Sequence, residues 1–129
     1  MRLVRAILCL SLLLPLSGCL VAAAAAGAAY GYIKYENNEA IRDFEAPLEG
    51  VWDAALDALE DRGYVIPGGV GRDLTDVQDD AEVEGDDYWL RVERHPGGIS
   101  RVRVRIGTFE TEENKRRAGL LIEAIEQRL

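Results

Sequence analysis

The sequence predicts an α+β domain in which an antiparallel sheet of about four strands is packed by two helices. Two stretches, one after Pro47 and one after Thr111, repeat apolar residues at three- and four-residue steps, which indicates amphipathic helices. Between them, apolar and polar residues alternate in segments bounded by glycine-rich turns, as in strands with one face toward water. The expected order is β-α-β-β-β-α, because both helices need an apolar face to cover.

The first strand is expected at 41–45, although its apolar residues do not alternate strictly. Pro47 suits a first helical position, since its fixed φ matches the helix and its missing N–H would be unpaired there. The helix that follows is expected to end at Gly63. Its buried stripe consists of Leu48, Val51, Trp52, Ala55, Leu56 and Leu59.

Strands are expected after this helix wherever apolar and polar residues alternate. A short strand is predicted at 64–66 and a longer one at about 75–84, followed by a hairpin of 88–95 and 99–106. One face of these strands is expected to be buried. Its side chains are Val77, Ala81, Val83, Tyr88, Leu90, Val92, Val102, Val104 and Ile106.

The last helix is expected to begin at Thr111, whose hydroxyl can accept a hydrogen bond from the first turn. Glu112 and Glu113 near its start, and Arg128 near its end, have the charges that the helix dipole favours. The buried stripe of this helix is predicted to consist of Ala118, Leu121, Ile122, Ile125 and Leu129.

The N-terminus has the three parts of a bacterial export signal. Arg2 and Arg5 give a positive start, 6–14 is apolar, and Pro15 breaks the helix before a cleavage site. The alternative is an uncleaved signal anchor at 3–33. In both cases the two arginines hold the N-terminus inside, and the rest of the chain crosses the membrane.

The residues after Pro15 have the form of a lipobox. Leu16, followed by the small residues Ser17 and Gly18, fits the narrow site of the lipoprotein signal peptidase, and Cys19 supplies the thiol that takes a diacylglyceryl group. Cleavage frees the amine of Cys19 for a further acyl chain, such as palmitate, and two or three chains hold a protein durably in a membrane. Leu20 is not the aspartate that favours inner-membrane retention, so the expected location is the outer membrane, facing the periplasm.

The segment after Cys19 is rich in alanine and glycine. At 20–33 it is shorter than the ~20 apolar residues that span a bilayer, so a tether is expected. Gly27 and Gly31 leave self-association open as an alternative. The predicted organisation is a signal peptide at 1–18, an acylated cysteine and tether at 19–37, and a small α+β domain at 38–129.

Composition excludes several classes of function. Cleavage after residue 18 removes Cys9, and Cys19 is acylated, so the mature domain has no thiol for a disulfide, a metal or catalysis. Of the 15 basic residues Arg2 and Arg5 are lost, which leaves 13 against 23 acidic residues. A protein this acidic is expected to repel nucleic acid, and no cofactor is expected.

Several short motifs are distributed over the chain: the lipobox, the lead into Tyr30-Gly31-Tyr32, the helix start Leu48-Glu49-Gly50-Val51-Trp52-Asp53-Ala54, the helix end 59–64 and Ile106-Gly107-Thr108-Phe109. Together they resemble a family of small bacterial lipoproteins that is catalogued as a domain of unknown function, number thirty-five sixty-eight. The resemblance covers nearly the whole chain after the signal and brings no catalytic residues with it. The element order also resembles the helix-grip type of envelope domain, an analogy of fold alone.

No catalytic or metal site is expected. His95, the single histidine, precedes a Pro-Gly-Gly turn and has no serine or aspartate at a spacing that indicates a triad. The acidic stretch at 73–87 offers oxygen ligands for calcium but lacks the EF-hand spacing, so a solvated acidic face is expected. The chain is therefore not expected to be an enzyme.

The expected function is a structural or protein-interaction role in the cell envelope. The alternative is a binding module for a small apolar ligand or lipid in a groove between helix and sheet. Arg101, Arg103 and Arg105 form a dense basic row, expected either to pair with Glu93 on one side and Glu82 and Glu84 on the other, or to dock an acidic partner or anionic envelope polymer. The oligomeric state is not specified by the sequence.

Overall fold

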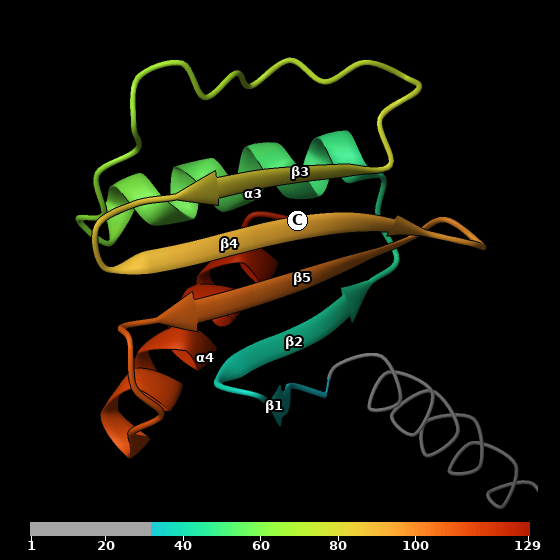
Figure 1. Ribbon diagram of the computed structural model, residues 1–129. Helices are drawn as coiled ribbons and strands as arrows, with labels where there is room; N and C mark the ends of the chain where they lie inside the picture. Colours follow the sequence, from blue (N-terminus) through green and yellow to red (C-terminus); the bar gives the residue numbers. More distant parts are fainter. Residues whose placement is uncertain (1–31) are drawn as a thin grey trace, which may run out of the picture. The chain divides into compact units, whose positions relative to one another are not determined.

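The computed structural model describes residues 32–129 (Figure 1). The signal peptide, the lipobox with Cys19 and most of the tether therefore lie outside the described residues. Within the described part neither helix is both long enough and apolar enough to cross a membrane.

An antiparallel five-stranded sheet and two helices make up the domain, which confirms the predicted α+β class with one strand more than expected (Figure 1). The strand order across the sheet is β1-β2-β5-β4-β3. The elements in chain order are β1 Lys34–Glu36, β2 Glu39–Phe44, α3 Leu48–Asp61, β3 Asp80–Glu84, β4 Tyr88–His95, β5 Ile99–Ile106 and α4 Glu112–Glu126.

The additional strand, β1, forms a hairpin with β2 and lies ahead of residue 38, where the domain was expected to begin. Asn37 and Asn38 make the two-residue turn between them, with φ angles of 52° and 63°. Asparagine tolerates this left-handed region better than most residues, and two such residues in succession suit the twist of a tight hairpin. The edge of the sheet thus begins inside the segment predicted as tether.

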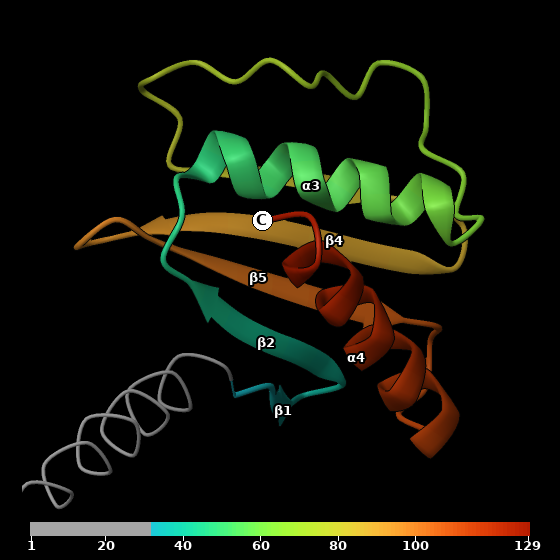
Figure 2. The same ribbon diagram turned by 180° about the vertical axis from the view of Figure 1, so that it is seen from behind.

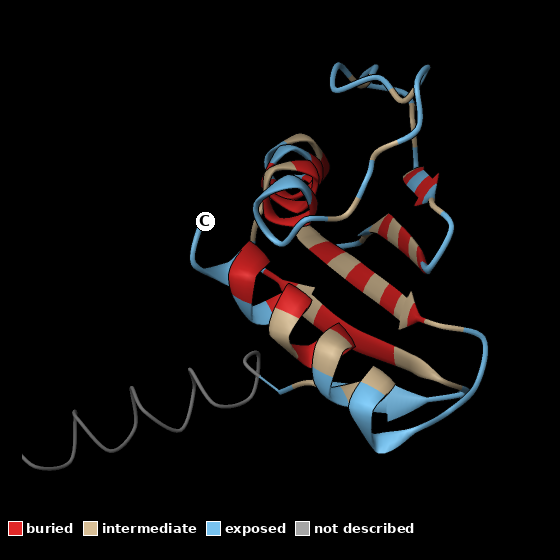
Figure 3. Ribbon diagram, turned by 90° about the vertical axis from the view of Figure 1, so that its left-hand side faces the viewer, coloured by how far each residue is buried: buried red, intermediate tan, exposed pale blue. Residues whose placement is uncertain are grey.

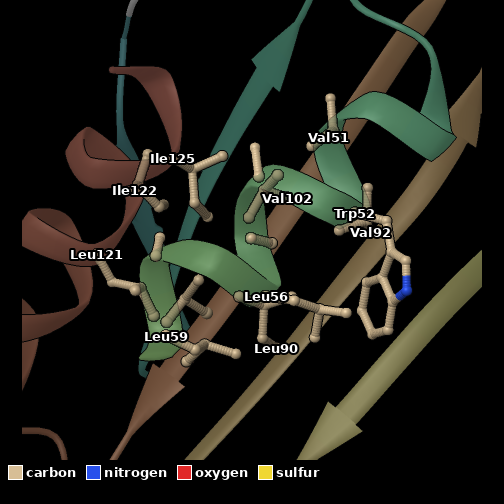
Figure 4. Close-up of a cluster of buried hydrophobic side chains, with 14 of the residues drawn as sticks. Val51, Trp52, Leu56, Leu59, Leu90, Val92, Val102, Leu121, Ile122 and Ile125 are labelled. Carbon is tan, nitrogen blue, oxygen red and sulfur yellow. The ribbon is translucent and has the colours of Figure 1, made fainter. Parts of the chain in front are cut away.

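Both helices lie on the same face of the sheet, where α4 contacts β2 and β5 and α3 contacts β4, β5 and α4 (Figure 2). The strands show the predicted alternation, with buried residues at every second position on β4 and β5 (Figure 3). Between sheet and helices lies one continuous apolar core (Figure 4). Its largest side chain, Trp52, is 2% exposed, which confirms the predicted register of α3.

The ends of both helices follow the predicted chemistry. Gly63, with a φ of +83°, closes α3: its N–H donates to Glu60 O and the next N–H, of Tyr64, donates to Leu59 O. The Thr111 hydroxyl accepts from the Asn114 N–H at 3.1 Å, and Arg128 donates to the Ala124 carbonyl at 2.8 Å. The helix α3 begins at Leu48, so Pro47 is its N-cap residue and not, as predicted, its first helical residue.

Of the two strands predicted between α3 and β4, the first is absent and the second is shorter than predicted. Residues 64–66 are not a strand, because no strand lies beside them: Tyr64 packs its ring edge-on against Tyr88 at 5.2 Å, and Val65 is exposed. The strand predicted from residue 75 begins only at Asp80, and Val77, assigned to the buried face, is 88% exposed. At the C-terminus, Leu129 was also assigned to the core and is exposed, because it lies beyond the end of α4.

The long loop between α3 and β3 is held to α3 through two neighbouring loop residues, Gly71 and Arg72. The indole N–H of Trp52 donates to Gly71 O at 3.0 Å, and Arg72 pairs with Asp53 and Asp57 at 2.7 and 2.9 Å. Because Trp52 is in the core and Arg72 is on the surface, the loop is fixed from both sides of the helix. The middle of the loop runs alongside α3, above the helix in both views (Figures 1 and 2).

Candidate functional site: the outer face of the sheet

The face of the sheet opposite the helices, here called the outer face, carries the predicted basic row. Its membership follows from the strand registers, because residues directly opposite one another on neighbouring strands point to the same side. The outer-face residues are Lys34 and Glu36 on β1; Glu39, Ile41 and Asp43 on β2; Ile99, Arg101, Arg103 and Arg105 on β5; Trp89, Arg91, Glu93 and His95 on β4; and Asp80, Glu82 and Glu84 on β3.

Arg101 and Arg103 are paired with carboxylates across the strands. Arg101 binds Asp43 through two hydrogen bonds of 2.7 and 3.0 Å. Arg103 reaches Glu39 and Glu93, each at 3.2 Å. These two arginines therefore form the cross-strand charge ladder that was one of the two expectations for the row.

The partners on one side of this ladder differ from those expected. Glu93 was predicted correctly, but Glu82 and Glu84 lie on β3, which is separated from β5 by β4. The strand on the other side of β5 is β2, so Glu39 and Asp43 take the place of the expected glutamates. The difference arises because β5, the last strand in the chain, returns to lie beside β2, and the local sequence pattern does not indicate this long-range pairing.

Arg105, the third member of the row, makes no ion pair with any residue in 32–129. Its guanidinium instead lies over the ring of Trp89, 5.3 Å from the centroid, and the Trp89 indole donates to Glu82 at 2.7 Å. A cation over an indole is stabilised by the ring quadrupole but keeps its N–H donors free. Arg105 and Trp89 line an open hollow of about 440 Å³ together with Asn37, Asn38, Glu84, Gly85, Asp86, Asp87, Tyr88, Gly107 and Thr108.

Sequence reasoning missed the Trp89–Arg105 pair. Each residue was placed correctly on the outward side of its strand, but their contact depends on the register of β4 against β5, in which Trp89 is opposite Arg105. The signal that was available is the length of the Pro-Gly-Gly turn, which sets that register.

His95 is the last residue of β4, directly before the turn, and its Nε2 is 3.2 Å from Glu93. Ser100 is the one serine of residues 32–129, and its hydroxyl donates to Ala46 O on the helix side of the sheet. Histidine and serine are thus on opposite faces. This part of the chain brings together no serine–histidine pair that could act as a nucleophile and base.

The acidic stretch does not converge on a point. Asp80 pairs with Arg91, Asp87 with Arg117, and Glu82 with Trp89, so these carboxylates are directed to different parts of the surface. Across residues 32–129 no three histidine, cysteine, aspartate or glutamate side chains gather as ligands for a metal ion.

Within the described domain, the alanines between helices and sheet line no groove that is open to solvent. Ala55 and Ala58 on α3 are 0% exposed and Ala118 on α4 is 2% exposed, as expected for small residues that let a helix pack closely on a sheet. A hollow of about 660 Å³ does lie beside the β3–β4 turn, lined by Tyr64, Val65, Pro67, Glu84, Asp86, Asp87, Tyr88 and Arg117, among others, but it is open to solvent and rimmed by charge. Burial raises the pKa of Tyr88, whose hydroxyl donates to Val65 O at 2.8 Å.

The Arg101–Asp43 pair is expected to make the stability of the domain depend on pH in the acid range. The hydrogen bonds from Arg101 lower the pKa of the Asp43 carboxyl from its ordinary value of 3.8, against a smaller opposing effect of burial. A carboxyl with a lowered pKa in the folded state stabilises the fold above its ordinary pKa, and that stability is lost as the pH falls through the lowered value. Asp43→Asn is therefore expected to lower stability at pH 7 and to reduce its loss below pH ~4, as measured by urea unfolding at a series of pH values. An unchanged pH profile would show that Asp43 contributes nothing to acid unfolding.

The remaining sequence-predicted site residues, Leu16, Ser17, Gly18 and Cys19, lie outside the described part of the chain. No curated protein sequence matches this chain. A family model does match it over residues 2–127, nearly its whole length. The chain belongs to the family described as "Protein of unknown function (DUF3568)".

Proposed function

We propose that this chain is a bacterial envelope lipoprotein, anchored by lipid on Cys19 to the outer membrane and facing the periplasm, whose domain binds a protein partner and catalyses no reaction. The proposed binding of a partner is supported by the composition of the outer face. Both helices pack on the other side of the sheet, and the outer face holds aromatic and charged side chains in fixed positions.

The anchor part rests on the sequence. The positive start, the apolar stretch and Leu16-Ser17-Gly18-Cys19 occur in the order and spacing of a lipoprotein signal. The domain adds one supporting feature, since β1 begins at Lys34 and the fourteen residues 20–33 thus separate it from Cys19. Such a tether spans at most ~50 Å when fully extended, which keeps the domain close to the membrane surface.

Within the outer face, the part best suited to contact a partner is the Trp89–Arg105 corner. Arg101 and Arg103 have their hydrogen bonds satisfied by carboxylates of the same face, so recruiting them would require breaking those pairs. Arg105 has free donors and lies on a large aromatic ring, and tryptophan and arginine are the residues that most often dominate protein interfaces.

The alternative function, a module for a small apolar ligand, has less support. Such a module needs an enclosed apolar cavity, and the hollows found here are open and lined by carboxylates as well as by apolar side chains. The closely packed alanines between helix and sheet favour the interaction role for the same reason.

The test is site-specific photocrosslinking in cells. A photoreactive residue at Ile99 or at Arg105 on the outer face is expected to give an adduct of defined mass, identified by mass spectrometry. The matched control is Glu123, an exposed residue of α4 on the opposite side of the domain, which is expected to give no such adduct. Equal adducts from Glu123 and the outer face, or none from the outer face, would contradict the proposed interaction.

A further inference from the structure

The sheet has one long open edge, β3. It is the last strand in the order β1-β2-β5-β4-β3 and has five residues, whereas β1 at the other end has three. An open edge presents backbone donors and acceptors to which another strand can pair.

The direction of these backbone groups follows from two hydrogen bonds that flank the β3–β4 ladder. The Arg94 N–H donates to Asp79 O at 2.7 Å, and the Gly85 N–H donates to Tyr88 O at 3.0 Å. In an antiparallel pair such bonds recur at every second residue, so Ala81 and Val83 direct their backbone groups toward β4. Asp80, Glu82 and Glu84 direct theirs away from the sheet, and no backbone hydrogen bond within 32–129 occupies them.

The same three residues carry carboxylates on the outer face. Asp80 pairs with Arg91 and Glu82 accepts from Trp89, while Glu84 makes no ion pair with another described residue. A strand added antiparallel to β3 would form hydrogen-bonded pairs with these three residues, and its side chains at those positions would lie directly beside the carboxylates. The edge therefore favours a partner segment that is extended and that carries positive charge.

A second copy of this chain does not fit the edge. Pairing β3 with itself across a two-fold axis at Glu82 would place Glu82 opposite Glu82 and Asp80 opposite Glu84. Like charges directly opposite one another destabilise a sheet. The complementary occupant is an extended segment with basic side chains at alternate positions.

We infer that β3 accepts, as an added antiparallel strand, an extended segment of a partner protein with lysine or arginine at every second position. This deepens the proposed interaction function and rests on it. The segment gains affinity from backbone hydrogen bonds, which is how peptide-binding domains use a sheet edge. Its specificity comes first from Glu84, the one carboxylate of the three that neither forms an ion pair with a described residue nor accepts a side-chain hydrogen bond from one, because Asp80 is already paired with Arg91 and Glu82 with the Trp89 indole. The alternative is that these acidic residues prevent any strand from pairing with the edge. The experiment below distinguishes binding from such protection.

The probe is a short peptide of alternating lysine and valine, added to the full-length chain in detergent. In the proposed geometry the lysine N–H groups point toward β3, and the valine N–H groups point away. A peptide N-methylated at its valines is therefore expected to bind, while one N-methylated at its lysines has the same charge and cannot pair.

The measurement is amide hydrogen exchange by NMR at Glu82 and Glu84. At a probe concentration about ten times its dissociation constant, exchange of these two amides is expected to slow about tenfold with the valine-methylated peptide. The lysine-methylated peptide is expected to leave it unchanged. Binding of both peptides without protection would show adsorption by charge alone and overturn the inference, as would the absence of binding. Neither result affects crosslinking from Ile99 and Arg105, so the proposed function is judged separately.

Two matched variants of the protein test whether a carboxylate on β3 contributes to peptide binding. Glu84→Gln removes an exposed carboxylate that makes no ion pair with the rest of the domain and is expected to weaken the valine-methylated peptide about two- to fivefold. Glu123→Gln on α4 removes the same charge far from β3 and is expected to leave affinity unchanged. Equal weakening by the two variants would overturn the assignment to β3.

Discussion

Replacing Trp52 by alanine is expected to lower the free energy of unfolding by about 3–5 kcal/mol. The side chain is 2% exposed and lies where α3 meets β4, so its removal leaves a cavity that the surrounding core cannot fill (Figure 4). It also removes the hydrogen bond to Gly71 O that holds the long loop. Because a typical domain is stable by only ~5–15 kcal/mol, the melting temperature is expected to fall by more than about 10 °C.

Two variants control this measurement. Trp52→Phe keeps most of the apolar volume but loses the indole N–H, and is expected to cost about 1–2 kcal/mol. Val77→Ala removes an apolar side chain that is 88% exposed and is expected to have almost no effect. If Trp52→Ala unfolded at nearly the wild-type urea concentration, the assignment of Trp52 to the core would be wrong.

Replacing Cys19 by alanine is expected to abolish acylation and cleavage of the precursor, and with them anchoring in the outer membrane. Without the thiol no diacylglyceryl group is added, and the signal peptidase does not act on the unmodified precursor. The uncleaved chain is expected to be absent from the floating outer-membrane fraction. Two or three acyl chains at ~0.8 kcal/mol per buried methylene supply the affinity for the outer membrane, so their loss removes that anchor.

The chain offers a matched control in its other cysteine. Cys9 lies in the apolar part of the signal, and Cys9→Ala is expected to fractionate as the wild type does. Wild-type cells treated with globomycin, which inhibits the lipoprotein signal peptidase, are expected to accumulate the precursor. Membrane flotation of Cys19→Ala at the wild-type level would favour the uncleaved signal anchor instead.

Much of the fold could be predicted because burial imposes a period on the sequence. The alternation in 88–95 and 99–106 and the three- and four-residue steps of the two helices each place one face against the core, and the structure confirms all four elements. The prediction of a strand at 64–66 was wrong for a reason that local composition cannot reveal. Three residues with high β propensity form a strand only if another strand lies beside them.

The topology of the sheet could not be predicted in the same way. Local pattern gives the face that each strand buries but not which strands are neighbours, so Arg101 was assigned outward without its partner Asp43, which lies 58 residues away in sequence. The hairpin of β1 and β2 had a usable signal in Asn37-Asn38. It was overlooked because only three residues precede the turn in β1, too few to show alternation.

The same limit applies to the candidate site. The sequence identified Arg101, Arg103 and Arg105 as one basic row, and the structure divides it into two paired arginines and one that lies on Trp89. That division comes from the neighbours on β2 and β4, which are set by tertiary structure. A row of like side chains on one strand therefore need not act as a unit.

The central claim of the proposed function is that Cys19 is the mature N-terminus and carries the lipid, because the location and the orientation of the domain both depend on it. Intact-mass spectrometry of the protein purified from membranes tests this claim most directly. We predict a chain that lacks residues 1–18 and whose N-terminal peptide, beginning at Cys19, carries the added mass of a diacylglyceryl group and a further acyl chain. A mass that corresponds to the unmodified chain from Met1 would contradict the claim.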